Sequence, residues 1–219
     1  MKVRLQWTYE IPKTKRKVTM QSALLEASEC IELLNDLEKT GRLNEVTIFD
    51  ENDTAWTKKQ WLRHLERKET EPHEVTAYVD GNFDRASKRA GIGIVIYYKK
   101  DGATWRVRLN DEFDYLHDNN EAEFAALYRL LLELEQLGVR AQKLTVFVDS
   151  LTVQKQAAGE WPCYEKNYAY WLDKVDAIAD KLHLTIAYEL IERNDNKEAD
   201  RLASQALRGT LIESTTERP

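Results

Sequence analysis

Four acidic residues of the chain stand where elements of secondary structure are expected to begin or end. Asp80 closes the alternating apolar run VTAYVDG, and Asp149 closes the β-rich run LTVFVD. Glu123 and Asp200 each lie one turn into an expected helix, where the positive end of the helix dipole favours negative charge. Ligands of open α/β sheets collect where strands end and helices begin, so we expect these carboxylates to meet. Oxygen donors of this kind suit hard divalent cations such as Mg²⁺.

Taken singly, each acid has a simpler interpretation. Asp80 with Gly81 could be a hairpin turn, which is the commoner meaning of an Asp-Gly pair. A solvated acid in the first turn of a helix is also very common. The prediction of a site therefore depends on whether the four carboxylates lie close together. A buried carboxylate is costly without a partner, so a positive group is expected beside them.

The elements that must hold these acids are expected within residues 75–208. Three strands joined by short turns should be antiparallel, and strands and helices then alternate. The order predicts an α/β domain with a mixed five-stranded sheet flanked by helices. The polar segment 209–219 is expected to be a loose tail. The expected strands are 75–81, 91–98, 103–109, 143–149 and 184–191, and the expected helices are 119–137, 150–158, 166–182 and 196–207.

Residues 1–68 are expected to form a separate, small α+β accessory domain, with a strand at 2–10 and a helix from Ser22 to about Lys39. Residues 69–74 are charged and include Pro72, which predicts a linker. The basic turn KTKRK at 13–17, near several tryptophans, would suit contact with a nucleic-acid backbone and stacking. The tryptophans could instead form the core of the domain, which we favour, and a dimerisation or protein-partner module is a third option. The partner of this domain thus stays open.

Composition narrows the class of protein. With 219 residues and 42% hydrophobic content, the chain can bury a sizeable core. A net charge of −6 argues mildly against a chain that coats nucleic acid throughout. Cys30 and Cys163 have no metal-ligand spacing and indicate a reducing compartment. Because no stretch could span a membrane or serve as a signal peptide, we expect a soluble, cytoplasmic protein without a membrane partner.

Four short blocks of sequence resemble, in order and spacing, the acidic blocks of type 1 ribonuclease H: DG at 80–81, NNEAE at 119–123, VDS at 148–150 and NKEADRLA at 196–203. The resemblance covers about residues 75–207, the length of one domain. It implies metal-dependent endonucleolytic cleavage of the RNA strand of an RNA–DNA hybrid. It also implies that two Mg²⁺ ions, with Mn²⁺ as a substitute, are held by Asp80, Glu123, Asp149 and Asp200.

The same resemblance implies which residues face the substrate. Glu123 with the amides of Asn119 and Asn120 would read the ribose 2′-hydroxyl, which separates RNA from DNA, although Asn119 could equally cap its helix. Many members carry a histidine before the last acid, and Arg193 or Asn196 could replace it here. The expected substrate-binding residues are Gly81, Asn82, Asn119, Asn120, Arg193 and Asn196.

The chain departs from the best-known bacterial pattern in three places. It has no basic helical insertion between Ala158 and Lys166, no histidine in the loop before Asp200, and Asn82 where a small residue is usual. These departures leave the acids intact but bear on substrate affinity and turnover. The second hypothesis is therefore a nucleic-acid-binding protein that keeps the fold with weak or no catalysis.

Overall fold

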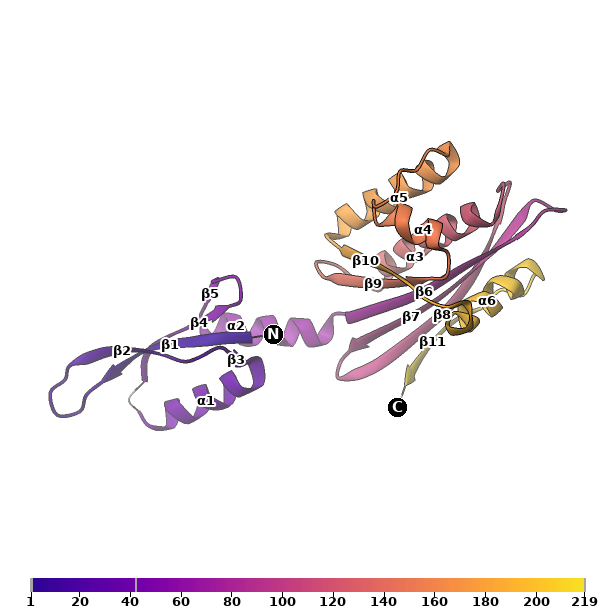
Figure 1. Ribbon diagram of the computed structural model, residues 1–219. Helices are drawn as coiled ribbons and strands as arrows, with labels where there is room; N and C mark the ends of the chain where they lie inside the picture. The colour runs from indigo at the N-terminus through magenta and orange to yellow at the C-terminus, as the bar shows by residue number, and fades with distance from the viewer. Residues whose placement is uncertain (1, 42, 219) are drawn as a thin grey trace. The chain divides into compact units, whose positions relative to one another are not determined.

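The computed structural model describes residues 2–41 and 43–218, with the backbone alone at 44, 67 and 68, and it divides the chain into two compact units, 1–67 and 68–219 (Figure 1). The boundary falls inside helix α2 (Lys58–Thr70), and strand β6 already begins at His73. The expected linker over 69–74 is therefore reduced to Glu71 and Pro72. Its charged residues are good helix formers, so they extend the helix until proline ends it.

The first unit is a small sheet with helices packed on it. Strand order is β2–β1–β4–β5, and β3 pairs with the start of β1. The first helix begins at Ala27 rather than at the expected Ser22, because Glu26 and Glu29 form a capping box there. The elements before α2 are β1 (Lys2–Glu10), β2 (Lys17–Gln21), β3 (Leu25–Glu26), α1 (Ala27–Lys39), β4 (Leu43–Asp50) and β5 (Ala55–Trp56).

The tryptophans of the first unit belong to its core. Trp61 is 1% exposed, and Trp7 and Trp56 pack against the same cluster. The indole N–H of Trp56 also donates to the Asp50 carboxylate at 3.0 Å. These side chains therefore pack inside the unit, as in the interpretation that the sequence analysis favoured.

The second unit is built on a six-stranded mixed sheet with the order β10–β9–β6–β7–β8–β11. Strands β6, β7 and β8 form an antiparallel meander, while β9 and β10 run parallel to β6. The remaining elements are β6 (His73–Asp84), β7 (Arg89–Lys100), β8 (Ala103–Asp114), α3 (Asn119–Leu137), β9 (Lys143–Val148), α4 (Leu151–Ala157), α5 (Lys166–Leu182), β10 (Thr185–Leu190), the 3₁₀ turn η1 (Arg193–Asp195), α6 (Lys197–Leu207) and β11 (Glu213–Arg218).

The sixth strand corrects the expectation of a loose tail at 209–219. Strand β11 pairs antiparallel with β8 along its whole length. Buried Asn110 of β8 fixes the segment that leads into β11. Its amide donates to Thr210 O and to Leu202 O, both at 2.9 Å, and its Oδ1 accepts from Ile212 N–H at 2.6 Å. A polar segment can thus be ordered by backbone pairing that hydropathy does not reveal.

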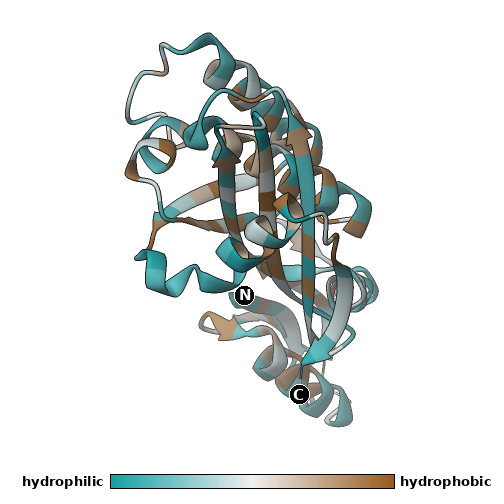
Figure 2. Cartoon of the chain, turned by 90° about the vertical axis from the view of Figure 1, so that its right-hand side faces the viewer, coloured by the Kyte–Doolittle hydropathy of each residue, from teal (hydrophilic) through white to brown (hydrophobic). Residues whose placement is uncertain are grey.

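Helices cover both faces of this sheet. Helices α3, α4 and α5 lie on one face and α6 lies on the other (Figure 1). Hydrophobic residues gather on the strands and on the helix faces turned towards them, while hydrophilic residues lie outward (Figure 2). No helix in the described part of the chain has the length and apolar character needed to cross a membrane.

Candidate active site

The parallel pairing of β6 with β9 places two of the acids side by side. Tyr78 is in register with Phe147 across this pair. Asp80 and Asp149 each follow two residues later, so they share one face and one end of the sheet. Both are buried: Asp80 is 1% exposed, and the Asp149 side chain is 6% exposed.

The third acid, Glu123, reaches the same point because α3 packs unusually close to the end of β6. A Cβ atom added at Gly81 would lie 2.5 Å from Ala122 C and from Glu123 N. Only glycine permits this approach of strand and helix backbones. Glu123 is consequently 4% exposed beside the end of β6.

The fourth acid is positioned by an equally close contact on the other face. Added Cβ atoms at Gly91 and Gly93 of β7 would lie 2.1 Å from Ala203 O and 2.0 Å from Ala199 O. Helix α6 therefore lies with its backbone against the strand, and Asp200 of α6 stands next to Asn82. The Asn82 amide donates to Asp200 Oδ1 at 3.3 Å.

The environment of Asp80 is strongly unfavourable for a bare carboxylate. Burial, and after it the charges of Asp149 and Asp200, raise the pKa of Asp80 from 3.8 to about 7, against a smaller lowering by Arg193. Neither oxygen of Asp80 makes a hydrogen bond of good geometry with the described residues, although the nearby Gly81 N–H lowers its pKa a little, and Asp149 Oδ2 has only the Arg193 guanidinium, at 3.8 Å. Buried anionic oxygens without donors are typical of sites that a cation completes.

Glu123 shows the same effect from the other face of the sheet. Burial first, and then the charges of Asp80 and Asp149, raise the pKa of Glu123 to about 9. The electrostatic influence of these acids on one another indicates that they occupy one neighbourhood.

The oxygen-only donor set and its unpartnered atoms fit a hard divalent cation. Nevertheless, no group of three or more His, Cys, Asp or Glu side chains within residues 2–41 and 43–218 is positioned to hold a metal ion as it stands. The acids therefore share one end of the sheet without forming a finished coordination sphere.

The expected substrate-binding residues divide into two groups. Arg193 is 70% exposed, with Nε 3.8 Å from Asp149 Oδ2. Asn119 spans β6 and α3: its Oδ1 accepts from Phe83 N–H at 3.3 Å, and its amide donates to Glu123 Oε1 at 3.4 Å. Asn120 accepts a hydrogen bond of 3.5 Å from the Ser150 hydroxyl.

Gly81, Asn82 and Asn196 contact the protein itself. Asn196 is 1% exposed, and its amide donates to Val79 O at 2.8 Å. It thus ties the start of α6 to the strand that carries Asp80. Gly81 lies beneath the first turn of α3, and Asn82 is occupied with Asp200 and with the Ser204 hydroxyl at 3.0 Å.

A second polar cluster beside the site was not expected from the sequence. Asp118, rather than Asn119, caps α3 by accepting from Glu121 N–H at 2.9 Å, and it also accepts from the Tyr168 hydroxyl at 2.7 Å. Buried Glu121 accepts from Trp171 Nε1 at 3.2 Å and from His117 N–H at 2.8 Å. Burial opposes ionisation, but hydrogen bonds with Asn167, His117 and Trp171 outweigh it and lower the pKa of Glu121. A run of Asp-Asn-Asn offers three candidate caps, so the sequence alone could not select Asp118.

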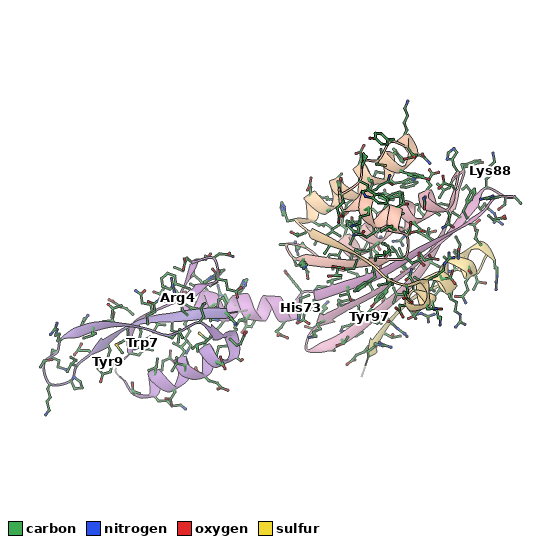
Figure 3. All side chains as sticks on the ribbon, in the orientation of Figure 1. Arg4, Trp7, Tyr9, His73, Lys88 and Tyr97 are labelled. Carbon is green, nitrogen blue, oxygen red and sulfur yellow. The ribbon has the colours of Figure 1, made fainter. Side chains whose placement is uncertain are left out.

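Two open clefts meet at Phe83. One, with a volume of about 650 Å³, is lined by Asn82, Arg193 and Asp200. The other, of about 460 Å³, is lined by the basic residues Arg85 and Lys88 together with Tyr115 and His117. Lys88 lies at the turn that joins β6 to β7 (Figure 3).

The connection between α4 and α5 contains no helix, as expected, and it carries two exposed aromatic residues. Trp161 is 46% exposed and Tyr164 is 83% exposed. Such exposed rings can stack on bases or sugars.

Comparison with known proteins places this geometry in context. The family described as "Reverse transcriptase-like" matches residues 78–206, a range that includes all four acids. The protein YpeP of Bacillus subtilis (strain 168), itself uncharacterized, is 41% identical over 192 residues, covering 88% of this chain and 84% of YpeP. That length exceeds the second unit, so the similarity extends into the first unit as well.

Several solved structures are similar to 62% of the chain. RNase H1 from the archaeon Halobacterium salinarum NRC-1 has 25% identity and a TM-score of 0.54, with 98% of its own chain covered. LC11-RNase H1, solved in complex with an RNA/DNA hybrid, has 25% identity, a TM-score of 0.55 and the same coverage. The N-terminal RNase H domain of rv2228c from Mycobacterium tuberculosis has 27% identity and a TM-score of 0.52, with 94% covered.

Proposed function

The chain belongs to the reverse transcriptase-like family and has a ribonuclease H-like domain. On this premise we propose that it is an endoribonuclease that uses divalent metal ions to cleave the RNA strand of RNA–DNA hybrids. One observation carries the proposal. Asp80 has two buried carboxylate oxygens without a hydrogen bond of good geometry, at the end of a strand where the charges of Asp149 and Asp200 act on Asp80 and those of Asp80 and Asp149 act on Glu123. Without a cation, this arrangement serves no structural purpose that the contacts explain.

The proposed roles follow from the surroundings of each acid. The carboxylates of Asp80, Glu123, Asp149 and Asp200 would hold two Mg²⁺ ions, because they supply the oxygen ligands that this cation prefers and the oxygens of Asp80 are not used in other hydrogen bonds of good geometry. Bound ions would supply an activated water nucleophile and stabilise the leaving 3′ oxygen. Asn82 orients the Asp200 carboxylate through its amide. The exposed guanidinium of Arg193 is placed to contact a phosphate near Asp149.

Substrate recognition is proposed for the two clefts. The RNA strand would lie over the cleft that contains Asp200 and Arg193, with Asn119 and Asn120 close enough to Glu123 to read the 2′-hydroxyl. The second strand would follow the basic cleft of Arg85 and Lys88. The presence of an RNA/DNA hybrid in the LC11-RNase H1 structure supports this choice of substrate class.

The test is cleavage of a labelled RNA–DNA hybrid in the presence of Mg²⁺ or Mn²⁺. Duplex DNA, duplex RNA and single-stranded RNA serve as parallel substrates, and Asp149→Asn is the matched variant because it keeps the shape of the side chain. We expect cleavage confined to the RNA strand of the hybrid and lost in the variant. Equal cleavage by the two proteins would refute the proposal.

The alternative is a nucleic-acid-binding protein with weak or no catalysis. The observation that favours this alternative is that no three potential metal-ligating side chains among the described residues are already positioned to hold an ion. This alternative predicts that the protein binds the hybrid in a mobility-shift assay but does not cleave it at any metal concentration. Rapid turnover would exclude it.

A further inference from the structure

Strand β2 forms an open edge of the first unit. Within the described residues it pairs with β1 alone, and all five of its residues are exposed. Val18 is 37% exposed and Met20 is 45% exposed. Edge strands in natural proteins are usually protected by charge, proline, a bulge or a cover, because their free backbone groups pair readily with another strand. Here only Lys17, at one end, is charged.

The apolar residues of β2 continue the core face of the sheet. Met20 is in register with Trp7, and Val18 is in register with Tyr9, so these side chains share a face with Leu5 and the core. Figure 3 shows Trp7 and Tyr9 along the strand, and the β1–β2 hairpin projects beyond α1 (Figure 1). The apolar face thus runs out to the sheet edge without a helix over its end.

The hydrogen-bonding pattern shows which backbone groups of β2 point away from β1. Ser22 N–H donates to Leu5 O at 2.9 Å. Because inward and outward groups alternate along an antiparallel strand, Met20 and Val18 also face β1, whereas Gln21, Thr19 and Lys17 present their N–H and C=O groups outward.

We propose that this edge pairs with the same edge of a second copy of the chain, antiparallel and centred on Thr19. In this register Thr19 lies opposite its own counterpart, Lys17 lies opposite Gln21, and Val18 lies opposite Met20. All outward backbone groups of β2 then find partners. The sequence KVTMQ is self-complementary in this sense, because apolar residues meet and no two like charges face each other.

A second copy is favoured over other occupants by this symmetry. A two-fold interface requires the same patch on both subunits to complement itself, and β2 meets that requirement residue by residue. The basic turn at 13–17 does not oppose the pairing, since an antiparallel arrangement sends the two turns to opposite ends of the interface. The proposal is independent of the acids of the second unit and of any activity they have.

The experiment measures the mass of the full-length chain by sedimentation equilibrium over a range of concentrations. Thr19→Lys would place two like charges directly opposite each other across the dyad, and we expect it to weaken association on the order of tenfold. Thr8→Lys is the matched control. Thr8 is the register partner of Thr19 on β1, so the same charge is added to the same face but one strand away from the edge, near Glu45.

The expected result is a dimer for the wild type and for Thr8→Lys, with a shift towards monomer for Thr19→Lys. Circular dichroism of each protein establishes that the fold is kept. A wild type that is monomeric at every concentration would overturn the proposal, as would a dimer that survives Thr19→Lys unchanged. An equal loss of association in Thr19→Lys and Thr8→Lys would overturn the assigned register.

Discussion

Replacing Asp80 with asparagine is expected to stabilise the metal-free protein at and above neutral pH. The substitution keeps the shape of the side chain and removes its charge. In the wild type, burial and the neighbouring charges of Asp149 and Asp200 raise the pKa of Asp80 from 3.8 to about 7. The folded protein therefore has either to bind a proton or to bury an unpaired charge at this position.

The sign and size of the effect follow from proton linkage. Between about pH 4 and about pH 7, folded Asp80 holds a proton that the unfolded chain releases, so the free energy of unfolding falls as the pH rises through this range. Full ionisation corresponds to a cost of about 4 kcal/mol for a pKa raised this far. Neighbouring acids share the repulsion, and the buried amide has its own desolvation cost, so we expect a net gain of about 1–3 kcal/mol for Asp80→Asn at pH 8.

The assay is urea unfolding in EDTA from about pH 4 to about pH 9, followed by circular dichroism and tryptophan fluorescence because the two units can unfold separately. Asp114→Asn, at an exposed acid that ends β8, serves as the control and should change little. Added Mg²⁺ should stabilise the wild type more than Asp80→Asn, since a ligand of the folded state adds to its stability. An Asp80→Asn protein that is no more stable than the wild type at pH 8, or equally favoured at pH 4, would refute the electrostatic reasoning.

Three further variants, the last a double substitution, test the packing of the second unit and the binding of substrate. Gly93→Ala should destabilise the second unit by about 1–3 kcal/mol and reduce hybrid cleavage, because its methyl group would lie 2.0 Å from Ala199 O; thermal unfolding and a cleavage assay measure the two effects. Asn110→Ala should cost about 1–3 kcal/mol and expose β11 to amide hydrogen exchange, since it leaves buried backbone groups unpaired. Trp161→Ala with Tyr164→Ala should weaken hybrid binding by about 1–3 kcal/mol for each stacked base, measured by fluorescence anisotropy, while unfolding in urea stays unchanged.

The fold was largely predictable where hydrophobic periodicity determines structure. The helices at 119–137 and 166–182 and the first strand at 2–10 have the expected bounds, because each carries a regular apolar face that packs on a core. Strands β6, β7 and β8 extend further than expected, through polar residues. Backbone pairing within an antiparallel meander needs no apolar side chain, and β11 was missed for the same reason.

The candidate site divides along a similar line. Asp80, Glu123, Asp149 and Asp200 were predicted from their positions at the ends of elements together with the resemblance to ribonuclease H. The contacts that position them could not be predicted, because they depend on how closely backbones approach in three dimensions. At Gly81, Gly91 and Gly93, backbone atoms of a helix lie in the space that a Cβ atom would need. In the sequence Gly91 and Gly93 look like ordinary strand glycines, and Gly81 looks like a turn or substrate-binding glycine.

These close contacts explain how repelling acids can be held together before any cation binds. At Gly81 the approach of α3 fixes Glu123 against β6, and at Gly91 and Gly93 the backbone of α6 fixes Asp200 against the same sheet. Burial first, and the repulsion after it, raise the pKa of Asp80 to about 7 and that of Glu123 to about 9, so both acids must release protons before they can serve as full anionic ligands. Affinity for a divalent cation should therefore be tied to pH across the neutral range. The buried acids destabilise the fold, and apolar packing and the glycine contacts offset that loss. Such an arrangement is expected of a site that is suited to a ligand rather than to the stability of the chain.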